Sequence, residues 1–170
     1  MLDYEICPMT TETEMKEKGY VHWKAWQETY AGLMPDEYLK RVSLENCVKM
    51  ARKHPQNTLL LKVDCKTVGF CCFRKSEDAE KSYEIVAIYL LKEYQGKRLG
   101  YALLKRALSM LPRDSDIVLW VLEGNDKAIS FYKKIGFDFN GKEKSLPFGT
   151  ERQMEWKYEK QASESAKNQR

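Results

Sequence analysis

The stretch LKEYQGKRLGYALLKRAL, Leu91–Leu108, joins a basic, glycine-containing turn to an amphipathic helical pattern. Gly96 and Gly100 flank the adjacent cations Lys97 and Arg98. Glycine loses much conformational freedom when it is ordered, and neighbouring cations repel each other, so the turn is best explained by an anion bound at a helix N-terminus. Apolar residues line one face of the predicted helix: Leu99, Leu103, Leu104, Ala107, Leu108 and Leu111.

Composition indicates a soluble globular chain with one domain, residues 1–158, followed by a polar tail, residues 159–170, that we expect to be disordered. Of the 170 residues, 43% are hydrophobic and 32% are charged, and the net charge is +4. This mild excess suits an anionic ligand. Because basic residues alternate with acidic ones, no nucleic-acid partner is expected.

No apolar run reaches the roughly 18 residues needed to span a membrane, and the N-terminal MLDYEICPMT lacks the features of a secretion signal. The five cysteines have neither metal-site nor disulfide-framework spacing, so we predict free thiols in a cytoplasmic protein without a metal site. They are Cys7, Cys47, Cys65, Cys71 and Cys72.

Helical and strand patterns alternate along the chain, which predicts an α/β (α+β) fold around a central sheet. The predicted strands are residues 4–9, 58–64, 66–75, 82–91, 116–122, 137–143 and 150–158. The predicted helices are residues 12–30, with Gly19 as a point of interruption, 36–53, 96–111 and 126–135. Asn125 and Gly136 are the expected caps of the last helix, and the nearly all-apolar strand 82–91 is expected to be covered on both faces.

Two common phosphate-binding motifs fail at the glycine turn. A Walker loop needs Ser or Thr after its lysine and a glycine five residues before its second glycine; here Arg98 and Leu91 occupy these places. A Rossmann fingerprint needs the spacing GxGxxG, which does not occur.

The turn instead resembles the acyl-CoA pyrophosphate loop, [Q/R]xxGx[G/A], of the GNAT (Gcn5-related N-acetyltransferase) superfamily. Gln95 and Gly100 match the motif, whereas Arg98 replaces the family's first glycine. With right-handed helical dihedrals Arg98 fits and its guanidinium adds a contact to phosphate; with a positive φ the loop is strained.

A second resemblance lies in LWVLEGNDKAISFYKKIGF, Leu119–Phe137, where a strand ends in Asn and the next helix carries a Tyr before K-x-G-F. The matching positions are Asn125, Ala128, Phe131, Tyr132, Gly136 and Phe137. Two family motifs in the right order are far more specific than one. The chain is therefore identified as a member of the superfamily over nearly its whole length.

Membership implies a GNAT-like fold: a central mixed, mostly antiparallel sheet that splays in the middle, flanked by about four helices. It also implies acetyl-CoA, whose pantetheine arm would bind the backbone of Ile88, Tyr89 and Leu90. Their apolar side chains equally suit a core strand, and Asn125 equally suits a helix cap. The implied cofactor residues are Ile88, Tyr89, Leu90, Gln95, Gly96, Lys97, Arg98, Leu99, Gly100, Tyr101 and Asn125.

Two residues are candidates for catalysis, Tyr132 from the resemblance and Glu84 from its place at the start of the buried strand. Tyr132 would protonate the departing thiolate, although it could also belong to an aromatic core stripe with Phe131. A primary amine is protonated at pH 7 and needs a base before it can attack a thioester; Glu84 is the candidate, with a solvent-facing strand-end charge as the alternative. Cys71 and Cys72 are interpreted as strand residues, so we expect direct attack without an acyl-enzyme.

The acceptor side is expected around the first helix, where His22, Trp26 and Tyr30 share one face. Aromatic rings either pack a core or hold a cation, and Trp26, Tyr30 and Tyr83 are the substrate candidates. The segment resembles small-molecule members of the superfamily, which predicts a small primary amine such as a polyamine. Open alternatives are a protein or peptide amine and a catalytically silent CoA-binding module; a homodimer is also open.

Overall fold

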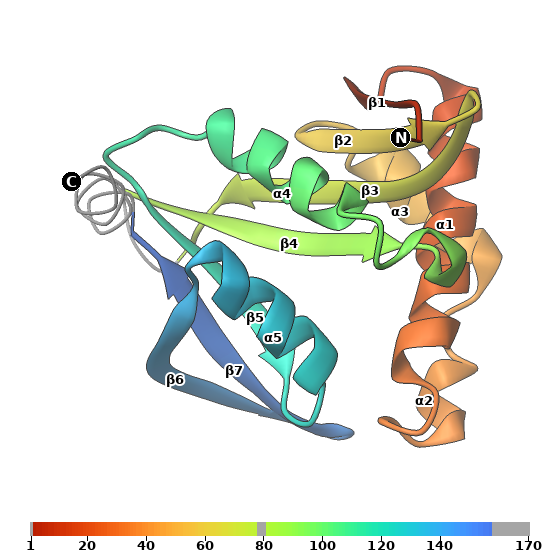
Figure 1. Cartoon of the computed structure of the whole chain (residues 1–170). Helices are drawn as coiled ribbons and strands as arrows, with labels where there is room; N and C mark the ends of the chain where they lie inside the picture. The colour runs from red at the N-terminus through yellow and green to blue at the C-terminus, as the bar shows by residue number, and fades with distance from the viewer. Residues whose placement is uncertain (1, 78–80, 158–170) are drawn as a thin grey trace. The chain divides into compact units, whose positions relative to one another are not determined.

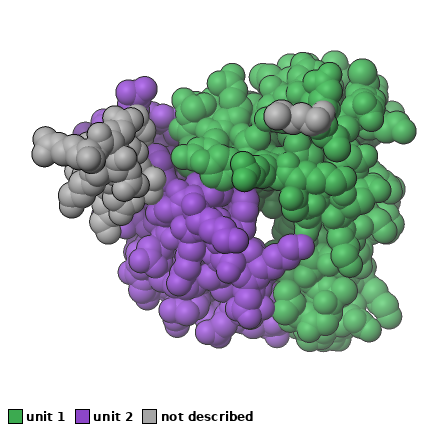
Figure 2. All heavy atoms as spheres, viewed as in Figure 1, with its two compact units in different colours: residues 1–73, 87–110 green, residues 74–86, 111–170 purple. Residues whose placement is uncertain are grey.

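The computed structural model describes residues 2–77 and 81–157, and the chain divides into two compact units (Figures 1 and 2). Unit 1 comprises residues 1–73 and 87–110, and unit 2 comprises residues 74–86 and 111–170. The predicted tail, residues 159–170, lies outside the described residues. Within the described ranges, none of the helices combines the length and apolarity needed to cross a bilayer.

The described residues form a seven-stranded sheet with the order β1-β2-β3-β4-β5-β7-β6. Its strands are β1 (Tyr4–Pro8), β2 (Thr58–Val63), β3 (Lys66–Lys75), β4 (Ser82–Leu90), β5 (Asp116–Leu122), β6 (Asp138–Leu146) and β7 (Gly149–Trp156). The helices are α1 (Glu12–Tyr30), α2 (Asp36–Leu39), α3 (Leu44–Lys53), α4 (Leu99–Ser109) and α5 (Asp126–Ile135), with a 3₁₀ turn at Lys92–Tyr94. Strands β4 and β5 are parallel, and the pairs β1–β2, β2–β3, β5–β7 and β6–β7 are antiparallel, so the predicted mixed, mostly antiparallel α/β fold is confirmed.

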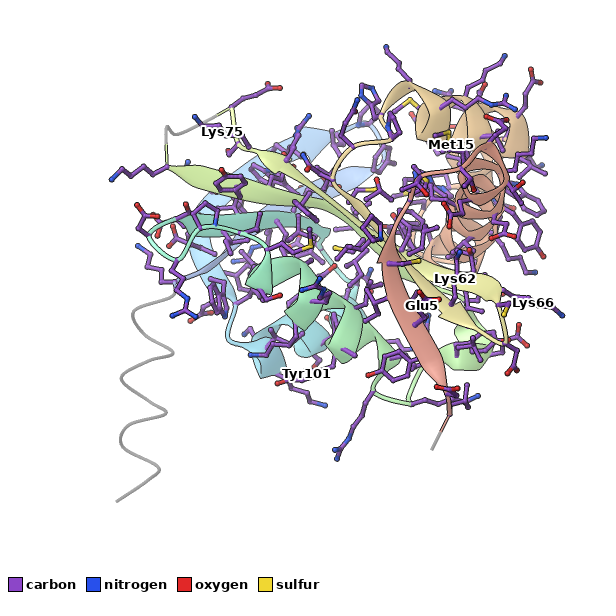
Figure 3. All side chains as sticks on the ribbon, turned by 90° about the horizontal axis from the view of Figure 1, so that it is seen from above. Glu5, Met15, Lys62, Lys66, Lys75 and Tyr101 are labelled. Atoms are coloured by element: carbon purple, nitrogen blue, oxygen red, sulfur yellow. The ribbon has the colours of Figure 1, made fainter. Side chains whose placement is uncertain are left out.

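Unit 1 is layered, with α1 and α3 on one face of its strands and α4 on the other (Figures 1 and 3). Strand β2 is buried on both faces: Leu59, Leu60 and Leu61 are at most 1% exposed. Leu60 pairs with Phe70 of β3, and both pack against Val21 of α1. The predicted apolar stripe of α4 is buried as well, which fixes the start of this helix beside the sheet.

Gly19 does not interrupt α1, which is continuous from Glu12 to Tyr30. A Cβ at position 19 would lie 2.8 Å from the Cα and 2.9 Å from the backbone nitrogen of Val48 on α3. Because backbone atoms cannot yield at such distances, glycine is required for the close approach of α1 and α3. Gly19, which the sequence indicated as a break in the helix, instead allows α1 to pack closely against α3.

The prediction of one helix over residues 36–53 is wrong. The chain makes two helices, α2 and α3, with extended backbone at Ser43 between them. The Ser43 hydroxyl accepts a hydrogen bond from the backbone N–H of Asn46 at 3.2 Å, which caps α3. Ser43 was therefore a local start signal inside a segment whose apolar pattern looked continuous, and it accounts for one helix more than expected.

Two further expectations are corrected around β4. The helix predicted from Gly96 begins at Leu99, because the preceding residues form a turn. Strand β4 is not covered on both faces: Val86 is 48% exposed, and the residues from Ala87 to Leu90 are only half-buried. An apolar strand with partly open residues has surface available for a ligand.

Unit 2 contains the parallel pairing of β4 with β5, followed by the antiparallel strands β7 and β6. The β4–β5 register runs from Ser82↔Asp116 to Ile85↔Leu119. Helix α5 lies along one face of these strands (Figure 1). Its predicted caps are confirmed: the Asn125 side chain accepts from the N–H of Ala128 at 3.2 Å, and Gly136 ends the helix with φ 108°.

Candidate active site

The N-terminus of α4 differs from those of the other long helices. Side chains cap α1, α3 and α5, through Thr11, Ser43 and Asn125. Arg98 occupies the cap position of α4, and within the described part of the chain no side chain accepts from its first turn. The first N–H groups of a helix need acceptors and carry partial positive charge, so this end fits an anion.

Arg98 has a left-handed backbone, with φ 62° and ψ 4°. Of the two conformations considered for this position, the structure adopts the strained one, which costs a non-glycine residue about 1 kcal/mol. Gly96, two residues earlier, also has a positive φ, 77°, and a Cβ there would meet nothing within 4 Å. The turn is open at Gly96 and adds the charges of Lys97 and Arg98, both exposed, so the residues present fit a phosphate-bearing cofactor.

Three hydrogen bonds hold the strained turn. The Gln95 side chain donates from Nε2 to the carbonyl oxygen of Leu90 at 2.9 Å. The backbone N–H of Lys92 donates to Oε2 of Glu28 at 2.9 Å. The Leu91 N–H donates to the Val68 carbonyl at 3.0 Å. Gln95 was predicted as a cofactor residue, and its side chain anchors the turn; Glu28, on α1, was missed because nothing in the sequence links it to position 92.

The other predicted cofactor residues of unit 1 surround this turn. Ile88, Tyr89 and Leu90 form the half-buried end of β4, past the register that it shares with β5. Lys97 lies 5.4 Å from the ring centroid of Tyr94. Tyr101, labelled in Figure 3, is 46% exposed on the outer side of α4.

An aromatic cluster joins α1 to the end of β4 in unit 1. The rings of Trp26 and Tyr30 lie 4.5 Å apart, and that of Trp26 lies 6.4 Å from Tyr89. The hydroxyl groups of Tyr30 and Tyr89 are within hydrogen-bond distance, at 3.2 Å. His22 stacks on Tyr89 at 5.4 Å and meets Phe70 edge-on at 5.5 Å. Two predicted acceptor residues therefore contact one predicted cofactor residue.

His22 is held neutral in this cluster. Burial among the rings, with a smaller contribution from the nearby Lys18 cation, lowers the pKa of His22 from 6.5 to about 4. Its Nδ1 and the Nε1 of Trp26 are buried and have no hydrogen-bond partner among the described residues. The ring therefore acts as an uncharged packing group at neutral pH.

Glu84, the candidate base, lies on β4 in unit 2. Its Oε2 accepts from Nε of Arg74 at 2.9 Å and lies 2.8 Å from Nη2 of the same guanidinium. The Glu84 side chain is 15% exposed. Arg74 was not foreseen, since an ion pair between neighbouring strands leaves no local pattern. The neighbouring Tyr83, a substrate candidate, is half-buried.

Tyr132 and Asn125 also belong to unit 2. The half-buried Tyr132 ring lies 5.3 Å from Phe131 and 5.9 Å from Phe137. Asn125 uses its Oδ1 as a helix cap, which leaves its amide nitrogen for any contact with a cofactor. The candidate catalytic residues thus lie in unit 2, and the basic turn and aromatic cluster lie in unit 1.

Comparison with known proteins bears on the family and the fold of the chain. The model of the acetyltransferase (GNAT) family matches residues 19–137. An uncharacterised N-acetyltransferase of Bacillus subtilis, YuaI, is 29% identical over 71% of this chain and 72% of its own length. A spermidine N(1)-acetyltransferase of Thermoplasma acidophilum is 26% identical over 80% of this chain and 86% of its own length. The crystal structure of PaiA N-acetyltransferase from Thermoplasma acidophilum in complex with coenzyme A has a TM-score of 0.74 and 24% identity, covering 92% of this chain and all of that chain.

The chain belongs to the GNAT acetyltransferase family. It is an acetyl-CoA-dependent N-acetyltransferase, as the resemblance implied.

The depressed pKa of His22 predicts a pH-dependent stability. An unfolded histidine binds a proton below pH 6.5, whereas folded His22 does so only below about pH 4, so the free energy of unfolding falls as the pH is lowered through this window. We expect a loss of about 2 kcal/mol between pH 7 and pH 5 from this residue. Denaturant unfolding of His22→Gln should lack this component, and His54→Gln, at the exposed second histidine, should retain it. Equal pH slopes for the two variants would contradict the assignment.

Replacing Arg98 should have opposite effects on the stability of the protein and on its affinity for coenzyme A. Arg98→Gly relieves the left-handed strain, so its melting temperature should match or exceed that of the parent chain. Loss of a charge-assisted contact of about 1.5–3 kcal/mol should weaken coenzyme A binding, measured by calorimetry, at least tenfold. Arg106→Ala, at an exposed arginine of α4, is the matched control and should bind normally. Undiminished affinity in Arg98→Gly would remove Arg98 from the phosphate site.

Proposed function

We propose that the chain acetylates a primary amine of a small, positively charged molecule such as a polyamine, by direct attack of the amine in a ternary complex. The observation that carries the choice of acceptor is the similarity to the spermidine N(1)-acetyltransferase over 80% of the chain. The aromatic cluster on α1 supports it, because ring faces attract ammonium groups. A cytoplasmic setting and a homodimer are part of this proposal.

Bound acetyl-CoA supplies the acetyl group as a reactive thioester. The N–H groups of the first turn of α4, uncapped by any side chain among the described residues, would bind its phosphates, with Lys97 and Arg98 adding charge. Backbone groups of Ile88–Leu90, at the half-buried end of β4, would hold the pantetheine arm. Gln95 keeps the turn in shape through its bond to Leu90, and Asn125 contributes its amide nitrogen.

Glu84 is the proposed base. An amine with a pKa near 10 must lose a proton before it can attack, and a carboxylate can accept that proton directly or through a water. Arg74 bonds one carboxylate oxygen, Oε2, and leaves Oε1 as the oxygen available to the amine. Arg74 is then a positioning residue, since it fixes the carboxylate without meeting the substrate.

Trp26, Tyr30 and Tyr83 are the proposed acceptor residues. Trp26 and Tyr30 offer ring faces and a hydroxyl group, and Tyr83 is next to Glu84 in the chain. A protein or peptide amine is the second candidate, favoured by structural similarity to the ribosomal-protein-S18-alanine N-acetyltransferase of Escherichia coli, which has a TM-score of 0.64 and 18% identity, a likeness of fold alone.

A panel of amines tests the proposed acceptor. Thiol release from acetyl-CoA should be faster with polyamines than with aminoglycosides, free amino acids or peptides, because a polyamine carries its ammonium groups on a slender chain, whereas aminoglycosides are bulky and amino acids and peptides carry a carboxylate. Trp26→Leu should raise the KM for the best amine several-fold and leave the affinity for coenzyme A unchanged. Turnover confined to peptides, or to neutral and anionic amines, would contradict the polyamine proposal and leave the enzyme class intact.

Tyr132→Phe tests the proposed acid. The change keeps the ring beside Phe137 and removes only the hydroxyl group, which is needed most when the thiolate leaves. We expect kcat to fall by roughly 10²–10⁴-fold, with little change in coenzyme A affinity or melting temperature. Tyr20→Phe, at an exposed tyrosine of α1, is the control. A kcat within threefold of the parent value would make Tyr132 a packing residue and leave protonation of the thiolate to water.

A further inference from the structure

Unit 2 contains a polar pocket of about 260 Å³ on strands β4 to β7. Its side chains alternate along the strands with the buried apolar ones: Val118 lines the pocket, and its neighbours Ile117 and Leu119 are each 1% exposed. The polar residues that line the pocket include Ser82, Asp116, Asn140, Lys142, Gln153 and Glu155. The proposed roles in catalysis and cofactor binding use none of them.

Gln153 is the most unusual member of the pocket. It is 1% exposed, and its Oε1 accepts from Nδ2 of Asn140 at 2.8 Å. The orientation of the Asn140 amide is fixed, because its Oδ1 accepts the backbone N–H of Lys142 at 3.1 Å. Nε2 of Gln153 is therefore the nitrogen left over, and it has no hydrogen-bond partner among the described residues. A buried donor without an acceptor is costly, which points to an acceptor supplied by a bound molecule.

The other end of the pocket is acidic. Glu155 is two residues along β7 from Gln153, and Asp116 lies at the start of β5. Lys157, outside the pocket, lies 3.3 Å from Glu155, and both carboxylates raise the pKa of this lysine. Lys157 balances one of the two negative charges, so Asp116 and Glu155 together keep a single negative charge for a cation.

The two ends define the length of a ligand. Residues two apart on a strand are separated by about 6.7 Å, which is the backbone spacing of Gln153 and Glu155; Asp116, next to the Ile117 that pairs with Trp156, lies further along, about 13 Å from the level of Gln153. The pocket volume corresponds to about eight or nine water-sized groups at roughly 30 Å³ each. A molecule of similar size, with a cation at one end and an oxygen at the other, would satisfy both ends.

We propose that this pocket binds a small molecule with a primary ammonium group at one end, held by Asp116 and Glu155, and an oxygen acceptor at the other, held by Gln153 Nε2. An aminoamide and an ω-amino carboxylate share this chemistry; the second would also use Lys142. If the proposed function holds, the mono-acetylated product of a short diamine is such an aminoamide. The pocket would then be a second site that senses product.

Calorimetric titration without acetyl-CoA tests the pocket, with N-acetylputrescine, 5-aminovalerate and cadaverine as probes. Cadaverine carries ammonium groups but no oxygen. At least one of the first two should bind tenfold or more tightly than cadaverine, and the tighter of them distinguishes amide from carboxylate. Equal binding of all three, or no binding at millimolar concentration, overturns the proposal.

Variants locate the binding. Asp116→Asn and Gln153→Met should each weaken the preferred probe at least tenfold, and Asp114→Asn, at an exposed acid outside the pocket lining, should not change it. If the melting curve shows that Gln153→Met does not fold, the affinity of the preferred probe is measured for Asp116→Asn and Ser82→Ala instead. Unchanged affinity in both variants overturns the site. Turnover is measured separately: an active enzyme that binds no probe contradicts only the pocket, and a chain that binds a probe without acetylating amines contradicts only the proposed function.

Discussion

The N–H groups at the start of α4, which no side chain of the described residues caps, are the constraint from which the site follows. A helix buried along its apolar face, as α4 is by Leu103, Leu104 and Ala107, must still satisfy its first amides. The chain does this with side chains at α1, α3 and α5, and places an arginine without an acceptor at α4. Arg98 cannot cap the helix, since a guanidinium has no acceptor atom. An anion or water must therefore complete this helix, and positive charge beside it favours the anion.

The strain at Arg98 is tolerable because the turn is held at several points. Gln95 bonds the end of β4, Glu28 bonds the N–H of Lys92, and the Leu91 N–H bonds β3. Together these contacts tie the turn to Glu28 of α1, Val68 of β3 and Leu90 of β4, which all belong to unit 1. A residue in a sparsely populated backbone region persists only where its surroundings determine it, and such residues concentrate where ligands bind. The left-handed arginine thus agrees with a binding role for the turn.

Local chemistry made most of the fold predictable, and distant contacts made the rest unpredictable. Asn125 begins α5 and Gly136 ends it, and both could be predicted because a helix cap and a helix stop act within one helical turn. The same local signal at Ser43 would have predicted the start of α3. The sequence left two backbone conformations open at Arg98, and the contacts that anchor the preceding turn come in part from Glu28 and Val68, which are distant in the chain. The ion pair of Glu84 with Arg74 was hidden for the same reason. Sequence therefore named candidate site residues, and the structure showed which neighbours orient them.

The strands of unit 2 have an apolar face that packs into the core and a polar face that lines the pocket. Strand alternation sends Ile117, Leu119 and Met154 into a core that is almost fully buried. The residues between them, among them Asp116 and Gln153, face the other way and keep polar groups in a hollow surface. Burying the amide of Gln153 there lowers stability unless both its groups are paired, and the residues that the structure describes pair only the oxygen. An apolar side chain of similar size at position 153 would avoid this cost. We therefore explain the glutamine by a molecule that accepts a hydrogen bond from its Nε2.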